Sequence, residues 1–417
     1  MLYQRWLQIV ERYRHEIALA DLATQQQWTF GQLDQVRPDS ALPASGPLFP
    51  QGNRAGFILE TLSAWRQQRL LCPLEPGQQP PDAPPPPPGI VHWKTTSATT
   101  QAARLVAFTA AQLMADATQI VDSMGLRRDW PNVGVISLAH SYGFSNLVLP
   151  LLLHGIPLWL LESPLPENLR QAEAVAPGVT LAGVPALWRA WFDAGAIPAN
   201  VRLAISAGAP LPLPLEEAVF AKQSLKIHNF YGATECGGIA YDGGATPRTD
   251  PCLIGQPMRG VNLAVDESGC LEVRSGAVGE TYWPEAAPPL SGGRYRTTDL
   301  AVLRGGCVYL RGRASDQINV AGRKVSPERI EGELLQHESV RDCLVFGAPS
   351  HDDGRSEIIV ACVVTPETLG MEDLRRFLLT RLPAWQVPRE WKRVDSLAPN
   401  ERGKLSRAEW RRRLGYE

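Results

Sequence analysis

Five consecutive residues, Tyr231–Glu235 (YGATE), combine side chains that suit a nucleotide. The apolar run before them (LKIHNF) is typical of a buried strand, so the five residues are expected where that strand ends. An aromatic ring can stack on a base, a glycine allows close approach, a hydroxyl can bond a phosphate and a carboxylate can hold Mg²⁺. The alternative is an ordinary strand end, with the glutamate as the N-terminal charge of a helix.

A second candidate is Lys94–Thr100 (KTTSATT), which carries four threonines and one serine between two expected strands. A turn whose hydroxyls and backbone N–H groups point inward can bind a phosphate. The G-x-x-x-x-G-K-[ST] pattern does not follow, which excludes the P-loop of nucleotide hydrolases. Because Ser/Thr turns between strands are common, this segment alone is weak evidence.

Two single residues complete the candidate set. Asp299 in YRTTDL follows a strand turn, where a carboxylate can accept both ribose hydroxyls, although a lone aspartate there is more often a turn or cap residue. Lys404 in NERGKLSR follows Gly403 in a basic neighbourhood and can neutralise charge on a reacting carboxylate and an α-phosphate. Taken alone, Lys404 is one more exposed lysine.

The bulk composition limits the classes of protein. The chain has 417 residues with 44% hydrophobic and 20% charged residues, which fits two or three compact units with real cores. A net charge of -2 is too small to attract nucleic acid or an anionic membrane through an overall electrostatic field. Seven scattered cysteines without a C-x-x-C pair argue against a zinc site or a disulfide framework, and they favour a cytoplasmic location. No signal-peptide core is visible, and the longest apolar stretch, 147–161, contains prolines and His154, so no membrane span is expected.

The elements that must position these residues follow from the hydrophobic patterns. Helices are predicted for Met1–Ala20 and Arg54–Leu70, and the proline tract 80–88 is predicted to be an extended connector, with an SH3 ligand as the alternative. Thr109 and Gln112 predict a capping box for a helix that ends at Gly125. Five short apolar runs then predict buried strands of an α/β sheet: VGVISLA, IPLWLL, VTLAGV, VRLAISAG and LKIHNFYG.

The predicted secondary-structure pattern changes twice in the C-terminal part of the chain. Short strands punctuated by glycine predict a small β-rich subdomain over about 251–312. After that, a helix beginning at Ser326-Pro327, two strands and a helix near Met371–Arg381 predict a separate α+β unit. The expected fold class is therefore α/β, with a large N-terminal domain over 1–314 and a small, mobile C-terminal domain over 315–417.

The order and spacing of the motifs resemble the superfamily of acyl-CoA synthetases, peptide-synthetase adenylation domains and firefly luciferase. The resemblance runs from about residue 90 to 414, and it rests on segments in the family's order: SAGAPL (206–211), YGATE, IGQPMRGVNLAV, YRTTDL, GRASDQINVAGRKVSPERIE (312–331) and PNERGKLSR. It implies ATP-dependent activation of a carboxylic acid as acyl-AMP, with Mg²⁺, and then transfer to a thiol. The acceptor is coenzyme A, or the phosphopantetheine arm of an acyl carrier protein as the alternative.

The resemblance also implies roles for individual residues. Tyr231 and Gly232 would lie at the adenine, Thr234 at the α-phosphate, Glu235 at Mg²⁺ and Lys404 at the adenylation step. Further nucleotide contacts are implied for Thr96, Ser97, Thr99, Thr100, Ala207, Gly208, Ala209, Asp299 and Arg313. The implied acid pocket contains His140, Gly237 and Gly238. Ser315 would be the pivot between the domains, and Gly322 would line the thiol tunnel.

The chain departs from the family in three places. The phosphate loop, usually T-S-G-T-T-G-x-P-K, reads TSATTQAAR (Thr96–Arg104), so both glycines and the lysine are replaced. Alanine and glutamine adopt positive φ only at a cost, which predicts a different grip on pyrophosphate and slow adenylation. Thr298 replaces the glycine of Y-R-T-G-D, and the region before the loop is about half the family's usual length.

Two further questions stay open at this stage. A non-catalytic binding module, made so by the altered loop, is the alternative from a different class. The stretch 139–144 (AHSYGF) has no carboxylate for an α-amino group, and a buried ammonium without a counter-charge would be costly. An aromatic acid is therefore favoured, with a fatty acid as the alternative.

Overall fold

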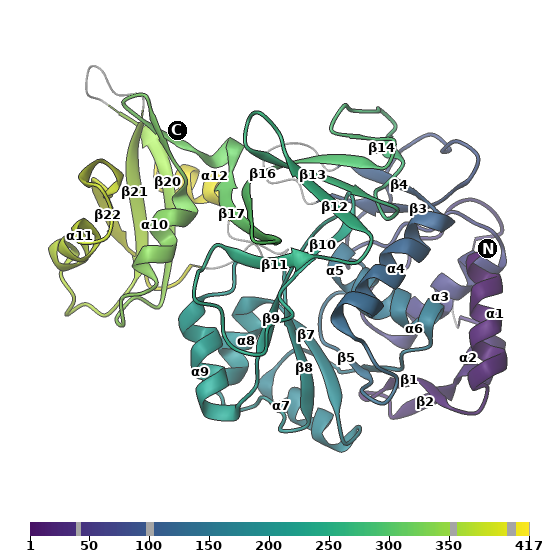
Figure 1. Ribbon diagram of the computed structural model, residues 1–417. Coiled ribbons are helices and arrows are strands. Elements are labelled where there is room, and N and C mark those ends of the chain that lie inside the picture. Colours follow the sequence, from purple (N-terminus) through teal and green to yellow (C-terminus); the bar gives the residue numbers. More distant parts are fainter. Residues whose placement is uncertain (39–42, 97–103, 351–356, 398–405, 417) are drawn as a thin grey trace.

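The computed structural model describes residues 1–38, 43–96, 104–350, 357–397 and 406–416 (Figure 1). Within this part, one continuous sheet of 14 strands forms the scaffold, and there are three smaller sheets, two of them in the C-terminal part. The sheet is parallel in the N-terminal half of the chain and antiparallel in the segment that follows. The predicted α/β class is confirmed.

The parallel half of the sheet carries the short apolar runs. Its strands lie in the order β9 (Ile227–Ala233), β8 (Val201–Ser206), β7 (Val179–Gly183), β5 (Asn132–Gly134), β6 (Leu158–Leu160) and β1 (Ile17–Asp21), and β2 (Gln26–Thr29) closes the edge antiparallel to β1. Burial on both faces explains why these runs are continuously apolar. Their carboxyl ends form one common edge.

The antiparallel half continues from β9. Its strands lie in the order β10 (Gly237–Tyr241), β11 (Leu253–Pro257), β17 (Cys307–Arg313), β16 (Arg294–Arg304), β13 (Cys270–Ser275) and β12 (Val261–Val265), with β15 (Leu290–Ser291) beside β16. The β-rich segment predicted from its glycine-punctuated strands is thus present. A separate three-stranded sheet, β14 (Thr281–Trp283), β4 (Leu105–Thr109) and β3 (Ile90–Thr95), lies to the right of β12 and β13 in Figure 1.

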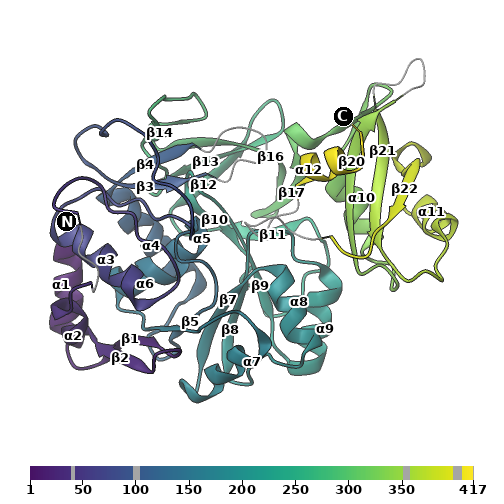
Figure 2. The same cartoon turned by 180° about the vertical axis from the view of Figure 1, so that it is seen from behind.

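Helices of the N-terminal half pack against the parallel strands. They are α1 (Leu2–Tyr13), α2 (Phe30–Gln35), α3 (Ala55–Arg66), α4 (Ala110–Met124), α5 (Ser141–Gly143), the π-helical turn η1 (Phe144–Val148), α6 (Leu149–His154), α7 (Pro166–Leu169), the 3-10 turn η2 (Arg170–Ala174), α8 (Pro185–Asp193) and α9 (Leu213–Gln223). Figure 2 shows α8 and α9 beside β7, β8 and β9, at a distance from α1 and α3. The capping box of Thr109 with Gln112 and the left-handed Gly125 are both present, as predicted for α4.

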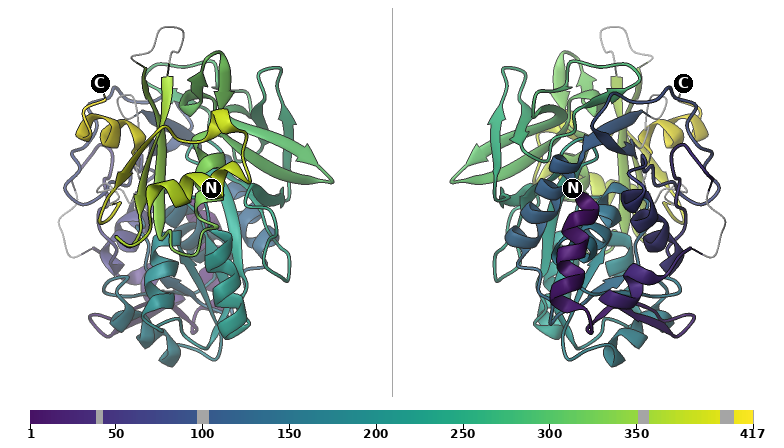
Figure 3. Two further views of the ribbon diagram at one scale, coloured as in Figure 1. Left: turned by 90° about the vertical axis from the view of Figure 1, so that its left-hand side faces the viewer. Right: turned by 90° about the vertical axis from the view of Figure 1, so that its right-hand side faces the viewer.

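The C-terminal part follows the short 3-10 turn η3 (Ala314–Asp316). Its elements are β18 (Ile318–Val320), β19 (Arg323–Val325), α10 (Pro327–Leu334), β20 (Asp342–Pro349), β21 (Glu357–Val364), α11 (Met371–Leu379), the 3-10 turn η4 (Ala384–Gln386), β22 (Glu390–Arg393) and α12 (Arg407–Arg413). Figures 1 and 2 show this part as a separate lobe in light green and yellow, and the left view of Figure 3 shows it in front of the large part. Among the described residues, no helix has the length and apolar character that crossing a membrane requires.

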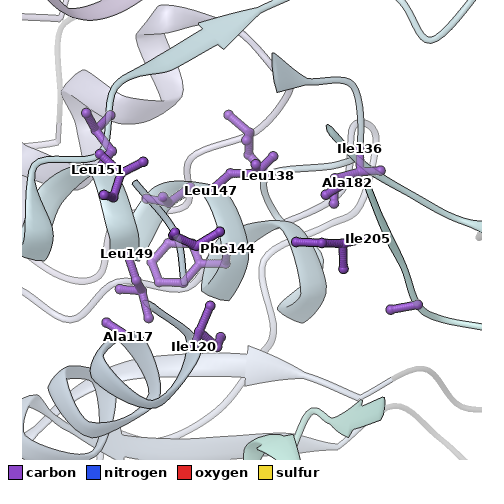
Figure 4. Packing of buried hydrophobic residues seen from close by; sticks show 14 of the residues in the cluster. Ala117, Ile120, Ile136, Leu138, Phe144, Leu147, Leu149, Leu151, Ala182 and Ile205 are labelled. Carbon is purple, nitrogen blue, oxygen red and sulfur yellow. The ribbon is translucent and has the colours of Figure 1, made fainter. Parts of the chain in front are cut away.

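The hydrophobic cores follow the same division. One large cluster contains buried residues from Leu2 to Val308, whereas two smaller clusters contain only residues from Ile318 onward. Figure 4 shows the middle of the large cluster, where Phe144, Leu147 and Leu149 meet residues of α4 and of the parallel strands.

Three predicted elements differ from the structure. The helix predicted over Arg54–Leu70 covers only Ala55–Arg66. The helix predicted over Met1–Ala20 ends at Tyr13, and Ile17–Asp21 is a strand because it pairs with β6 and β2. The strand predicted from VGVISLA contains only its first two residues, Val133 and Gly134, since the chain leaves the sheet there to reach α5. Residues 80–87 have no helix or strand, and Trp283 Nε1 donates to the carbonyl oxygen of Pro84 at 2.8 Å, which fits a connector held against the large part.

Candidate functional site

Several of the predicted site residues follow the carboxyl ends of neighbouring parallel strands. Ala207–Ala209 follow β8, the Tyr231 motif ends β9, and His140 lies in the segment between β5 and α5. In open α/β sheets this edge is where ligands bind. Ser206 at the end of β8 is fully buried, and its hydroxyl has no hydrogen-bond partner among the described residues.

The YGATE motif forms a β-hairpin. Strand β9 continues to Ala233, and β10 returns beside it with Gly237 opposite Ala233 and Gly238 opposite Gly232. The turn therefore consists of Thr234, Glu235 and Cys236, closed by Cys236 N donating to Ala233 O at 3.2 Å. The alternative of a helix N-terminus at Glu235 is wrong, because the residues after it form a strand.

Tyr231, Asp299 and Arg313 are brought together from three strands. The Tyr231 hydroxyl donates to Asp299 Oδ2, and Arg313 Nε lies 3.1 Å from Asp299 Oδ1. Asp299 and Arg313 are register partners on β16 and β17. Burial, with Asp299 beside it, raises the pKa of Tyr231 well above its usual range, so this hydroxyl remains a donor. Backbone N–H of Asp299 also donates to Thr297 Oγ1 at 3.0 Å.

Two tyrosines surround the Glu235 carboxylate. Tyr282 of β14 donates its hydroxyl to Glu235 Oε1 at 3.0 Å, and Tyr295 of β16 also interacts with this carboxylate. Burial raises the pKa of Glu235, and the hydrogen bonds from the two tyrosines act in the opposite direction.

The donor set at Glu235 fits Mg²⁺ that arrives with a nucleotide. Among the described residues, no group of three His, Cys, Asp or Glu side chains forms a complete metal cage. Mg²⁺ commonly binds one or two carboxylates together with substrate phosphates and water. A single carboxylate whose charge is poorly solvated is suited to that arrangement, because the cation would restore the ionised form.

The predicted phosphate loop connects β3 to β4. Thr96 and Arg104 close its base, because Thr96 N donates to Arg104 O at 2.8 Å and Arg104 N donates to Thr96 Oγ1 at 3.0 Å. Ser97, Thr99 and Thr100 lie outside the described residues. The Arg104 guanidinium lies 5.5 Å from the ring centroid of Tyr282, which in turn holds Glu235. The end of the loop is thereby linked to the candidate metal ligand.

The predicted acid pocket begins at His140. His140 caps α5, with its Nδ1 accepting from Tyr142 N at 3.3 Å. Tyr142 is half-buried beside Phe230, and its hydroxyl lies 3.5 Å from the carbonyl oxygens of Gly183 and Ile205. Gly237 and Gly238 begin β10 of the hairpin, and Gly238 N donates to the carboxylate of Asp116 at 3.3 Å.

The predicted pivot lies in η3 between two ion pairs. Ser315 is exposed and donates to Asp316 Oδ1 at 2.9 Å, while Arg407 Nη1 lies 3.1 Å from Asp316 Oδ2. Gly322 forms the turn of the β18–β19 hairpin with φ +81. Its neighbours line a cavity of about 430 Å³ with Trp385. Lys404 lies outside the described residues.

The structure adds residues that the sequence patterns did not single out. Tyr282, Tyr295 and Tyr142 contact predicted site residues, and Lys94, Asp116 and Ser145 form a buried polar cluster near them. The available signal was a charged residue, Lys94, inside an apolar strand. The available signal for Arg407 was its position at the end of the PNERGKLSR segment.

Comparison with known proteins gives two family matches. The AMP-binding enzyme family matches residues 59–283, and the AMP-binding enzyme C-terminal domain matches residues 329–404. The described residues of the C-terminal match thus lie within the separate lobe of the fold.

Individual relatives are more distant. A mitochondrial malonate–CoA ligase from Mus musculus is 27% identical over 377 residues, which cover 76% of this chain and 64% of the relative, slightly less than two thirds of its length. A probable 2-succinylbenzoate–CoA ligase from Mycobacterium tuberculosis is 29% identical and covers 78% of this chain and 84% of its own. A fatty acid–acyl-carrier-protein ligase from Streptomyces coeruleorubidus is 30% identical over 57% of this chain and 50% of its own. The ATP-bound MatB protein from Rhodopseudomonas palustris has the same fold, with a TM-score of 0.85 at 18% identity over 99% of both chains.

Proposed function

Since the chain belongs to the AMP-binding enzyme family, we propose that it activates a carboxylic acid with ATP as an acyl-AMP and transfers the acyl group to coenzyme A. The observation that carries the proposal is the convergence of Tyr231, Asp299 and Arg313 from three strands beside the Glu235 hairpin. An aromatic ring, a carboxylate and a guanidinium in contact form a site for the adenosine part of a nucleotide. Glu235 and Thr234 then face its phosphates.

In the first step, a carboxylate oxygen of the acid attacks the α-phosphorus of ATP, and pyrophosphate leaves with the bridging oxygen. Tyr231 stacks on adenine, Asp299 accepts from the ribose hydroxyls, and Thr234 donates to the α-phosphate. Glu235 would hold Mg²⁺, which would supply charge neutralisation at the phosphate oxygens. Lys404 offsets the negative charge that develops between the carboxylate and the α-phosphate.

In the second step, a thiolate attacks the carbonyl carbon of the acyl-AMP, and AMP leaves as the thioester forms. We propose that the block 315–417 turns about Ser315 between the steps as one domain. The large domain would be 1–314, with 251–312 as its β-rich subdomain. The turn removes Lys404 from the site and brings Gly322 to the thiol channel. The separate hydrophobic cores before and after the hinge support this division.

The acid is proposed to be aromatic or an extended chain, without an α-amino group. Small residues at Ala207 and Gly208 leave room for a flat or thin substrate, whereas the space beside Gly237 and Gly238 is occupied by Asp116 and Met258. The pocket segment 139–144 has no carboxylate. Relatives named for malonate, 2-succinylbenzoate and ferulate widen the panel that must be tried.

A carrier protein is the second candidate acceptor, favoured by the likeness to the fatty acid–acyl-carrier-protein ligase. To distinguish the two acceptors, wild-type protein and acyl-AMP are incubated with either coenzyme A or a phosphopantetheinylated carrier protein, and thioester formation is measured. Thioester formation with only the carrier would replace coenzyme A in the proposal.

ATP–pyrophosphate exchange tests the proposal as a whole. The panel contains acetate, malonate, hexanoate, decanoate, benzoate, 2-aminobenzoate, 2-succinylbenzoate and ferulate. We expect exchange that depends on Mg²⁺ and on one class of acid. If the protein binds ATP tightly but shows no exchange with any acid, the proposed enzymatic function is wrong and a non-catalytic binding module is favoured.

A further inference from the structure

A buried ionic network lies beneath the candidate site. Lys94 of β3, Asp116 of α4 and Ser145 of η1 are exposed by only 5%, 1% and 3%. Lys94 Nζ lies 3.3 Å from Asp116 Oδ2 and 3.0 Å from Ser145 Oγ, and Ser145 Oγ donates to the same carboxylate oxygen at 2.5 Å. Each polar group of the network therefore has a partner.

The surroundings of this network are apolar. The Lys94 ammonium lies 4.8 Å from the ring centroid of Phe108, and His92 of the same strand packs against Phe144 at 4.6 Å. Phe144 lies in the large hydrophobic cluster beside Ala117 and Ile120 of α4 (Figure 4). Replacing a buried ion pair by apolar residues of similar volume is often neutral or stabilising. Stability alone is thus a poor reason for this pair.

The second oxygen of Asp116 reaches the acid side of the site. Gly238 N donates to Asp116 Oδ1 at 3.3 Å. Gly237 has φ +68, and a Cβ at this position would lie 2.1 Å from Asp116 Oδ1. The carboxylate therefore occupies space that only a glycine leaves, directly against the backbone of the predicted acid pocket.

The network joins three segments that the proposed function requires. Lys94 lies two residues before Thr96, Ser145 lies five residues after His140, and Asp116 holds the backbone just after Glu235 and Cys236. Lys94 and Ser145 fix the Asp116 carboxylate, and this carboxylate fixes the backbone.

We propose that Lys94, Asp116 and Ser145 form a positioning network that fixes the Gly237–Gly238 backbone and thereby sets the affinity of the enzyme for its carboxylic acid. The inference rests on the proposed function. None of the three side chains needs to touch the acid, because Asp116 acts through the N–H of Gly238.

Two double variants separate positioning from stability. Lys94→Met/Asp116→Asn and Lys94→Met/Asp116→Leu both remove the ion pair, but only asparagine keeps a side-chain oxygen that can accept from Gly238 N. We expect similar melting temperatures for the two proteins. The leucine variant should raise the KM for the acid by about tenfold or more, as for a lost buried hydrogen bond, while the asparagine variant keeps most of the affinity. The acid is the one that wild type activates fastest in the panel, and the KM for ATP should change less than about threefold in both, well below that loss.

Asp242→Asn is the matched control. Asp242 lies 2.6 Å from Lys226 in another buried ion pair of the large core. This variant should lower the melting temperature and leave the KM for the acid unchanged. Equal acid KM values for the two double variants, or equal rises in the KM for ATP and for the acid, would overturn the inference.

Amide hydrogen exchange of residues 236–241 gives a readout without catalysis. The leucine double variant should lose protection in this segment, and the asparagine variant should keep it. If wild type activates no acid of the panel, the proposed function fails. Equal protection in both variants would instead refute the positioning network, so the two failures are distinguishable.

Discussion

At the scale of single residues, both carboxylate oxygens of Asp299 in the candidate site have side-chain partners. One carboxylate oxygen accepts from the Tyr231 hydroxyl, and the other lies 3.1 Å from the Arg313 guanidinium. A carboxylate offers about four acceptor positions, so the ribose hydroxyls can still be bound beside these partners. Both partners orient Asp299 before any nucleotide arrives.

Tyr231→Phe tests this preorganisation. The variant keeps the ring for stacking on adenine but removes the hydrogen bond to Asp299. A hydrogen bond to a charged group contributes about 1.5–3 kcal/mol, so the KM for ATP should rise about tenfold or more in the exchange assay. Tyr309→Phe, on the same strand as Arg313 but beside Arg304, is the control and should leave the KM for ATP unchanged. An unchanged KM for Tyr231→Phe would mean that Asp299 needs no orientation by this hydroxyl.

Lys404→Ala tests the proposed electrostatic role of this lysine. Loss of a group that stabilises charge in the transition state costs about 10²–10³ in rate, so acyl-AMP formation should fall by that factor. Thiol transfer from preformed acyl-AMP should change little, because Lys404 has left the site by then. Single-turnover measurements of both half-reactions provide the check. Equal loss in both would show that the lysine is structural.

At the scale of elements, α10 and α12 are joined by one guanidinium. Arg407 contacts Glu331 at 2.8 Å, Glu328 at 3.0 Å and Asp316 at 3.1 Å. Three carboxylates thus surround one cation, and they cannot all be neutralised by it. Burial, together with Glu328, raises the pKa of Glu331 to about 7, although Arg407 acts in the opposite direction.

This raised pKa predicts a pH dependence of stability. Between the usual pKa of a glutamate and about 7, the folded protein binds more protons at Glu331 than the unfolded chain does. Stability from this residue therefore falls as the pH rises through that window, by at most roughly 3 kcal/mol. Glu331→Gln removes the titration, so its melting temperature relative to wild type should increase from pH 5 to pH 8.

Glu333→Gln is the control for this prediction. Glu333 lies on the same helix, 3.6 Å from Arg381, outside the Arg407 cluster. Its melting temperature relative to wild type should not vary with pH. A difference for Glu331→Gln that decreases as the pH rises would show that Arg407 dominates over burial and keeps the pKa of Glu331 low.

The sequence predicts elements well where local signals decide their ends. The capping box at Thr109 and the glycine at 125 define α4 completely, and Ser326-Pro327 mark the start of α10. The sequence predicts Ile17–Ala20 as helix because the pattern there continues that of α1. Pairing with β6, about 140 residues later in the chain, decides its strand conformation, and no local pattern contains that partner.

The site follows the same rule. Tyr231, Asp299 and Arg313 are predictable because each lies in a recognisable motif, and the structure brings them into contact. The hydroxyls of Tyr282 and Tyr295 at Glu235 were not predictable from spacing, because they depend on how β14 and β16 approach the hairpin. The Lys94–Asp116 pair was hidden for the same reason.

At the scale of the whole molecule, Ser315→Pro tests the proposed domain rotation. Proline fixes φ near -65° and restricts Ala314 as well, so a large change of backbone dihedrals at this position becomes costly. Acyl-AMP formation should persist, while transfer to the thiol falls steeply and the adenylate accumulates on the protein. Paired half-reaction assays on one preparation measure both.

Replacement of the neighbouring Ala314 by serine is the control for this experiment, because it changes the side chain and leaves φ free. It should support both half-reactions at nearly the wild-type rate. If Ser315→Pro slows both steps equally, or neither, rotation about this residue is not how the protein works.

Arg313 belongs to two parts of the molecule at once. Its guanidinium holds the carboxylate proposed to bind ribose, and its backbone is the last residue of β17 before the turn that contains Ser315. In the proposed mechanism, a nucleotide that binds Asp299 therefore also affects Arg313. Through Arg313 it affects the backbone segment about which the small domain turns. By thermodynamic reciprocity, an orientation of the small domain that the bound nucleotide stabilises must bind the nucleotide more tightly, by the same free energy. Release of AMP and rotation of the small domain would therefore be coupled through Arg313.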